Sequence, residues 1–215
     1  MTAELKNVRW FRQRLLAWAK SNLRDYPWRE TSDPYFILVA EFLLQRTDAD
    51  TVKPIYETFL TKYPSVEDLA SADTKHIAEL LQPLGLFFRV ERLSQTAWII
   101  KERYAGKIPQ EERELLKLPG VGKYTARAIL SQAFKKPAAV LDTNVVRIIE
   151  RFFGITGGKV KSRCKILWHA ADSIAPAREV GHWNLTLLDF GAKVCTARNP
   201  QCDICPLYKK CHWAG

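Results

Sequence analysis

Four cysteines lie between residues 195 and 211, with the spacing Cys195-x6-Cys202-x2-Cys205-x5-Cys211. In a reducing compartment, such a tight group is more typical of a metal site than of a disulfide framework. Zinc ribbons usually have two short cysteine pairs, whereas here one Cys-x-x-Cys is flanked by longer gaps. Four thiolates without a histidine favour a [4Fe–4S] cluster. The fifth cysteine, Cys164, stands apart and is predicted to be a small buried hydrophobe.

A glycine-rich turn at residues 118–125, Leu-Pro-Gly-Val-Gly-Lys-Tyr-Thr, lies between two predicted helices. Gly120 and Gly122 let the backbone turn sharply and bring bare N–H groups to the start of the following helix, where Lys123 adds charge. Such a hairpin suits a phosphate and would grip the DNA backbone without reading sequence. An ordinary helix–turn–helix corner is the alternative. Seven basic residues against two acidic ones over 117–151 favour DNA.

Two carboxylates stand out by their surroundings. Asp142, in Leu-Asp-Thr-Asn-Val, precedes a helix and could simply be its N-cap. Glu41 shares a stripe with Ile37, Ala40 and Leu44 in a helix that is apolar nearly all round. A buried carboxylate must be paired, protonated or functional, and a raised pKa would suit a general acid. A structural partner, tyrosine or arginine, would explain Glu41 equally well.

The elements that position these residues are all expected to be helices. The formal net charge of +10 favours a polyanionic partner. The sequence has no apolar run long enough to span a membrane and no signal-peptide core, which predicts a cytosolic or nucleoid protein. We predict an all-α fold of two helical lobes with a central cleft. One lobe would be 25–135, and the other 1–24 plus 136–215, with the cluster loop at 195–211.

The expected helices follow from apolar periodicity and from Pro and Gly punctuation. The first covers 5–24 and is broken by Tyr26-Pro27-Trp28-Arg29. The second is capped by Asp33, with Pro34 at its first position, and runs to about Thr47. The others are expected at 51–62, 66–71, 74–82, 88–104, 111–117, 123–134, 143–153, 162–175 and 180–193.

Taken in order, these motifs resemble those of the helix–hairpin–helix DNA glycosylases of the endonuclease III and adenine glycosylase group. The similarity extends over nearly the whole chain. It includes Tyr-Pro-Trp-Arg at 26–29, Glu-Phe-Leu-Leu-Gln-Arg-Thr at 41–47, Pro-Gly-Val-Gly at 119–122, Leu-Asp-Thr-Asn-Val at 141–145 and the 6-2-5 cysteine spacing. The resemblance implies that Asp142 is the essential carboxylate and that the four cysteines hold the cluster.

The resemblance also bears on the type of reaction. Members that cleave the DNA strand have a lysine nucleophile two places after the second hairpin glycine, where this sequence has Tyr124. Because tyrosine cannot form a Schiff base, a monofunctional hydrolytic enzyme is implied. Glycosylases specific for G/T and G/U mismatches have tyrosine there and end soon after the cluster, as this sequence does. Adenine glycosylases usually have serine there and continue into a further domain, although Gln45 and Phe87-Phe88 look closer to them.

By resemblance, a monomer would bind double-stranded DNA that contains a mismatched or damaged base and rotate that base out of the helix. Gln45, Leu86 or Phe87 would enter the base stack, with Arg46 beside them. Glu41 and Tyr124 would contact the extruded base. The preferred substrate is thymine or uracil opposite guanine, and adenine is the alternative. A non-catalytic module that binds damaged DNA is a third hypothesis, but it needs neither carboxylate.

Overall fold

The computed structural model describes residues 5–85 and 88–214, and this part of the chain is helical without any β-strand. Within it, no helix combines the length and apolar character needed to cross a membrane. The α-helices are α1 (Val8–Ala19), α2 (Pro27–Glu30), α3 (Pro34–Leu43), α4 (Ala49–Lys62), α5 (Val66–Ala70), α6 (Thr74–Leu81), α7 (Phe88–Tyr104), α8 (Glu112–Leu115), α9 (Lys123–Gln132), α10 (Thr143–Phe153), α11 (Lys165–Ile174) and α12 (Val180–Lys193). The short 3₁₀ helices are η1 (Gln82–Leu84), η2 (Lys161–Arg163), η3 (Cys202–Ile204) and η4 (Tyr208–Lys210).

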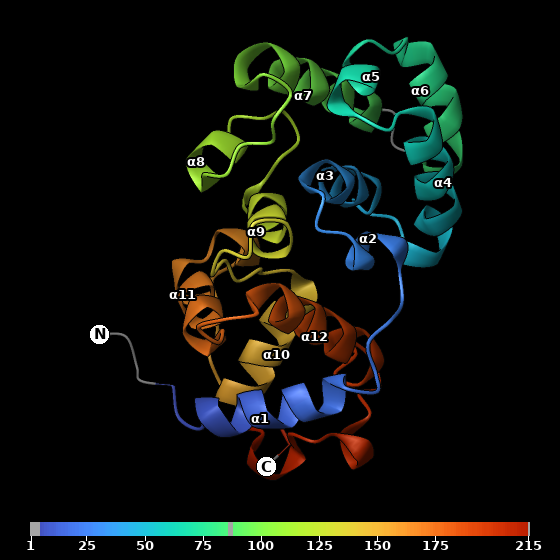
Figure 1. The fold of residues 1–215 in the computed structure, drawn as a ribbon. Helices are drawn as coiled ribbons and strands as arrows, with labels where there is room; N and C mark the ends of the chain where they lie inside the picture. The colour runs from blue at the N-terminus through green and yellow to red at the C-terminus, as the bar shows by residue number, and fades with distance from the viewer. Residues whose placement is uncertain (1–4, 86–87, 215) are drawn as a thin grey trace. The chain divides into compact units, whose positions relative to one another are not determined.

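The chain forms two compact units (Figure 1). Unit 1 is made of Met1–Arg24 and Lys135–Gly215, and unit 2 is the continuous segment Asp25–Phe134. Unit 1 therefore contains α1, α10, α11, α12 and the cysteines, whereas unit 2 contains α2 to α9 with the glycine hairpin.

Several helices begin at the cap residues that the sequence predicted. Asp33 accepts hydrogen bonds from the Tyr35 and Phe36 amides, and Pro34 occupies the first position of α3. Asp142 caps α10 in the same way, and Gly154 ends that helix in the left-handed conformation that glycine adopts most easily. These caps satisfy amides and carbonyls that have no partner within the helix.

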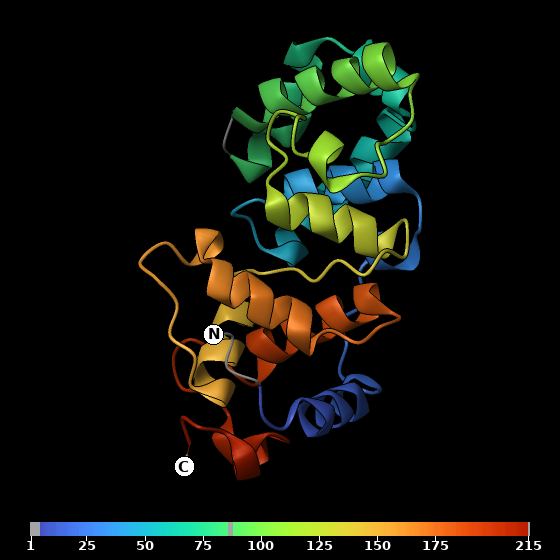
Figure 2. The ribbon, with the colours of Figure 1, turned by 90° about the vertical axis from the view of Figure 1, so that its left-hand side faces the viewer.

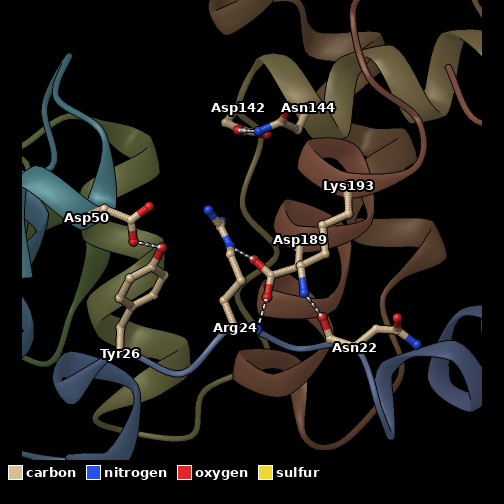
Figure 3. A network of polar contacts seen from close by, with 8 residues as sticks. All are labelled: Asn22, Arg24, Tyr26, Asp50, Asp142, Asn144, Asp189 and Lys193. Carbon is tan, nitrogen blue, oxygen red and sulfur yellow. Dashed lines mark hydrogen bonds and ion pairs between the residues drawn. The ribbon is translucent and has the colours of Figure 1, made fainter. Parts of the chain in front are cut away.

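In unit 2, α3 is the central element. Seven consecutive residues, Ile37 to Leu43, are buried, and α3 contacts α2, α4, α7 and α9. Figure 2 shows α3 and α9 side by side. The first helix ends before Tyr26-Pro27-Trp28-Arg29, and Pro27 starts a separate short helix, α2. Trp28 in α2 stacks on Tyr26, whose hydroxyl donates to Asp50 (Figure 3).

In unit 1, α12 packs against α1 and α10 (Figure 1). The core of this unit joins Phe11 of α1 to Phe152, Phe153 and Trp183. At the end of the first segment, the buried Asp189 of α12 accepts 2.7 Å hydrogen bonds from the amide and side chain of Arg24, as Figure 3 shows. The first helix is shorter than the expected 5–24, because its regular part is Val8–Ala19.

Candidate active site and cluster loop

The glycine hairpin of unit 2 has the sharp turn that its sequence predicts. Gly120 has a φ of +80°, and a Cβ added to it would lie 2.8 Å from Cε1 of Phe42. Position 120 therefore requires glycine both for its backbone conformation and for its contact with α3. Gly122 caps α9 in an extended conformation, with nothing within 4 Å of a Cβ added there.

Two side chains from other parts of unit 2 hold this hairpin in place. The side-chain amide of Gln45 donates to the Gly120 carbonyl over 3.2 Å, and the Thr96 hydroxyl donates to the Pro119 carbonyl over 2.8 Å. The carbonyls of the turn are thus held by the protein. The first amides of α9 point out of the start of the helix, where a phosphate oxygen would be favoured.

Gln45 and Arg46 do not continue α3 as the sequence suggested, because the helix ends at Leu43. Arg46 instead adopts a φ of +60° in the turn between α3 and α4 and is exposed. The side chain of Arg89 caps this end of the helix, because it donates to the Leu43 carbonyl and also to Thr47 beyond the turn. The other two expected insertion residues, Leu86 and Phe87, lie outside the described residues.

Glu41 and Tyr124 occupy adjacent helices of unit 2. Glu41 is only 9% exposed in the buried middle of α3, as its apolar surroundings predicted. Tyr124 lies in the first turn of α9, directly after the hairpin, and is half-buried. The helices α3 and α9 that bear these two residues pack against each other.

Asp142 belongs to unit 1, and both of its carboxylate oxygens are engaged. One accepts from the Val145 amide over 2.7 Å, and the other accepts from the Asn144 side-chain amide over 2.8 Å (Figure 3). Burial raises the pKa of Asp142 above its ordinary value, although these hydrogen bonds and the charge of Arg147 oppose the shift. The N-cap interpretation is thereby confirmed, and the group is a desolvated carboxylate as well.

A hydrogen-bonded series leads from Asp142 to the cysteine loop within unit 1. The Asn144 oxygen accepts from Arg147 over 2.6 Å, and Arg147 also donates to the Cys195 carbonyl over 2.6 Å. Sequence reasoning counted Arg147 only as part of the basic excess and gave Asn144 no role. The Asn144 contact is local to α10, but nothing in the sequence shows that Arg147 reaches Cys195, 48 residues further along.

The four cysteines of the 195–211 loop all line one cavity of unit 1. Arg151 lies beside this cavity and donates to the Cys195 sulfur over 3.5 Å and to the Thr196 carbonyl over 2.7 Å. Burial, followed by the proximity of the other three thiols, raises the pKa of Cys205 to about 11. Four thiolates gathered here therefore need a positive centre to be stable.

The donor set fits an iron–sulfur cluster. Such clusters are held by cysteine thiolates, usually four, and four cysteines line this one cavity. Cys195, Cys202, Cys205 and Cys211 would be its ligands.

Cys164 departs from its prediction. It is partly exposed at the N-terminus of α11, where it accepts a hydrogen bond from the Gly158 amide over 3.5 Å, rather than being a buried hydrophobe. The α11 helix begins only at Lys165, after the 3₁₀ turn η2, and not at 162 as expected. The helix period cannot distinguish such a 3₁₀ turn from the α-helix that follows it.

Comparison with known proteins agrees with these features. The family model of the HhH-GPD superfamily base excision DNA repair proteins matches residues 39–170. That of the iron–sulfur binding domain of endonuclease III matches residues 195–211, from the first of the four cysteines to the last. The chain therefore belongs to the HhH-GPD superfamily of base excision DNA repair proteins. Its C-terminal loop is the [4Fe–4S] binding motif of endonuclease III, and the chain is a DNA glycosylase.

Individual relatives show which glycosylases the chain is similar to. A thymine/uracil-DNA glycosylase of Methanothermobacter thermautotrophicus is 40% identical over 200 residues, which cover 93% of this chain and 90% of the relative. The solved structure of a thermostable thymine-DNA glycosylase has a TM-score of 0.92 and 38% identity, with 97% of each chain covered. An adenine DNA glycosylase of Buchnera aphidicola is 35% identical over 94% of this chain, but only 58% of that protein is covered.

Proposed function

We propose that the chain is a monofunctional glycosylase that removes thymine or uracil mispaired with guanine and leaves the DNA strand intact. Tyr124 carries this proposal. It stands at the start of α9, directly after the hairpin, where strand-cleaving members of the group have a lysine. A phenol cannot form the imine that strand cleavage requires. The 40% identity to a thymine/uracil-DNA glycosylase over most of both chains supports the same substrate.

In the proposed reaction, the bond between C1′ of the sugar and the base nitrogen breaks, and the base leaves with the electron pair. Asp142 is ionised and stabilises the positive charge that develops on the sugar. Water then adds to C1′ and loses a proton, with Asp142 available to accept it. Because Asp142 is an N-cap with both oxygens hydrogen-bonded, its carboxylate is already oriented before DNA binds.

Glu41 and Tyr124 contact the extruded base and assist its departure. Glu41 lies in the buried middle of α3, where its carboxyl group would contact an oxygen or nitrogen of the base. Tyr124 supplies a phenol from the adjacent helix.

The DNA-contacting set proposed from the sequence is retained. Gly120, Gly122 and Lys123 would bind a phosphate at the start of α9, and Gln45 and Arg46 would meet the bases from the turn after α3. Leu86 and Phe87 are the other candidates for insertion into the base stack. Cys195, Cys202, Cys205 and Cys211 would hold a [4Fe–4S] cluster, which would tie the 195–211 loop together. Hydrolysis itself changes no oxidation state. We propose that the enzyme acts as a monomer on nucleoid DNA.

A panel of duplexes tests the proposal. Thymine, uracil, adenine and hypoxanthine are each placed opposite every normal base, and strand breaks are measured before and after alkali under single-turnover conditions. We expect breaks only after alkali, and fastest with thymine or uracil opposite guanine. Robust removal of adenine without activity on these mismatches would refute the substrate assignment. Strand breaks without alkali, together with a covalent enzyme–DNA complex trapped by borohydride, would refute the monofunctional assignment.

Adenine opposite guanine or oxidised guanine is the second candidate, favoured by Gln45 and the paired aromatics Phe87-Phe88 and by the 35% identity to an adenine glycosylase. Glu41→Gln distinguishes the two reactions. Adenine must be protonated to leave, whereas thymine can leave as a stabilised anion. The variant should therefore lose much more activity on adenine than on thymine, as measured by single-turnover rates on both substrates.

A further inference from the structure

Arg89 is the most deeply buried cation of unit 2 among the described residues. Its side chain is 1% exposed, and its Nε has no hydrogen-bond partner. Burial lowers the pKa of this guanidinium. Arg89 also lies in the first turn of α7, where the helix dipole disfavours a positive charge. A buried cation with an unpaired nitrogen is costly, so the other contacts of this guanidinium must offset that cost.

Arg89 donates hydrogen bonds to two turns of unit 2, the one after α3 and the one before α7. One terminal nitrogen, Nη1, donates to the Leu43 carbonyl over 2.6 Å, and the other, Nη2, donates to the Thr47 hydroxyl over 2.6 Å. These two acceptors flank the turn that holds Gln45 and Arg46. Nη2 also donates to the Leu84 carbonyl over 3.3 Å, directly before Gly85. A planar guanidinium with fixed donors sets the spacing of these three acceptors.

The turn that holds Gln45 and Arg46 is joined to the glycine hairpin as well. Gln45 donates to the Gly120 carbonyl, so a displacement of the Gln45–Arg46 turn would also displace the phosphate-binding loop. Arg46 is held in the left-handed region at a φ of +60°, which costs about 1–2 kcal/mol for a residue with a Cβ and needs support from its surroundings. Arg89, which holds both ends of this turn, provides that support.

We infer that Arg89 is a positioning residue for base extrusion. It holds the Gln45–Arg46 turn, the Leu84–Gly85 backbone and, through Gln45, the hairpin at fixed spacing before DNA binds. The inference rests on the proposed function, because extrusion is the step that these turns serve. Arg89 does not touch the substrate. It affects the rate at which the nucleotide rotates out of the helix, not the rate at which the glycosidic bond is cleaved.

A matched pair of variants at Thr47 gives the cleanest test. Thr47→Val keeps the shape of the side chain but removes the oxygen that accepts from Arg89, whereas Thr47→Ser keeps the oxygen. Each is measured on thymine opposite guanine within a duplex and on thymine in an unpaired bulge, which needs little extrusion. Thr47→Val should slow excision from the duplex about ten-fold and leave the bulge within about two-fold. Thr47→Ser should behave like wild type.

Direct changes of Arg89 extend the series. Arg89→Lys retains the charge but cannot reach all three acceptors, and Arg89→Met removes it. Arg103→Met, at an exposed position of the same helix, controls for the loss of an arginine from α7. Unstacking is read from the fluorescence of 2-aminopurine placed beside the target base. The duplex-bound fluorescence should fall for both Arg89 variants and remain unchanged for Arg103→Met.

The outcomes separate the inference from the proposed function. Equal losses on the duplex and the bulge, or an unchanged 2-aminopurine signal, would overturn the positioning role of Arg89. If wild type excised no thymine or uracil, the proposed substrate would be wrong. The 2-aminopurine fluorescence of the two Thr47 variants would still decide whether Arg89 controls unstacking, because it should fall for Thr47→Val and not for Thr47→Ser. Should Arg89→Met fail to fold, the Thr47 pair alone decides the question.

Discussion

Replacing Asp142 by asparagine separates the cap from the chemistry at one position. In Asp142→Asn, the side-chain oxygen can still accept from the Val145 amide, so the N-cap of α10 survives. The other oxygen becomes an NH₂ group that faces the Asn144 amide, which is also a donor. Asn144 cannot turn over without losing the 2.6 Å hydrogen bond from Arg147 to its oxygen.

The expected magnitudes follow from these contacts. Losing a hydrogen bond to a charged acceptor costs about 1.5–3 kcal/mol, and removing a desolvated carboxylate offsets part of that cost. We expect a net loss of about 0–2 kcal/mol, and each kcal/mol lowers the Tm by about 2–4 °C in a chain of this size. A unit charge about 4 Å from the sugar cation is worth about 4 kcal/mol, so excision should fall about a thousand-fold.

A compensating change keeps the test clear. In Asp142→Asn combined with Asn144→Asp, the new NH₂ group donates to the new carboxylate, which still accepts from Arg147. The double variant should regain the Tm of wild type within about 2 °C while excision stays low, because the charge now lies at position 144. Melting curves and single-turnover rates on a mismatched duplex measure both effects. Full excision by Asp142→Asn, or recovery in the double variant, would refute a catalytic charge at position 142.

Three further predictions concern pH, the hairpin and the cluster. Burial raises the pKa of Asp142, so the rate of excision should fall with acid at a higher pH than for an exposed aspartate. With a raised pKa, Asp142 holds its proton more tightly in the folded protein than in the unfolded chain, so wild type loses stability as pH rises through that pKa. Asp142→Asn has no such proton, and its free energy of unfolding should therefore rise relative to that of wild type over the same pH range. Gly122→Ala should weaken binding to matched and mismatched duplexes alike in anisotropy titrations without changing the Tm, whereas Gly120→Ala, at a φ of +80° and against Phe42, should lower the Tm. Purified protein should be yellow-brown with about four irons per chain, and Cys202→Ser should weaken DNA binding, whereas one stoichiometric zinc would refute the cluster assignment.

The sequence predicts those features of the fold whose cause is local. Asp33-Pro34 and Asp142 mark helix starts because an N-cap needs only a side chain and the next three amides. The cysteine spacing also carries its meaning within one short loop. The family model confirms the cluster, and the comparisons confirm the glycosylase and its helical fold.

Features set by distant contacts were not predictable in this way. The sequence predicts that α3 runs to about Thr47, but the helix stops at Leu43, whose carbonyl accepts from Arg89, 46 residues away. The contact from Arg147 to Cys195 is invisible for the same reason. The catalytic roles of Asp142, Glu41 and Tyr124 stay predictions, since the geometry of each is known but its action on DNA is not.

The division of unit 1 into two sequence segments has a consequence for synthesis of the protein. Phe11 and Leu15 of α1 are fully buried in the mature fold, and Phe11 packs against Phe153 and Trp183. Those partners leave the ribosome long after α1, and at about 5–20 residues per second the delay is on the order of 7–35 s. Unit 2 is continuous and can fold during that time. The nascent chain would then carry a folded unit 2 behind an amphipathic helix whose apolar face has no partner yet, the kind of exposed surface that chaperones bind.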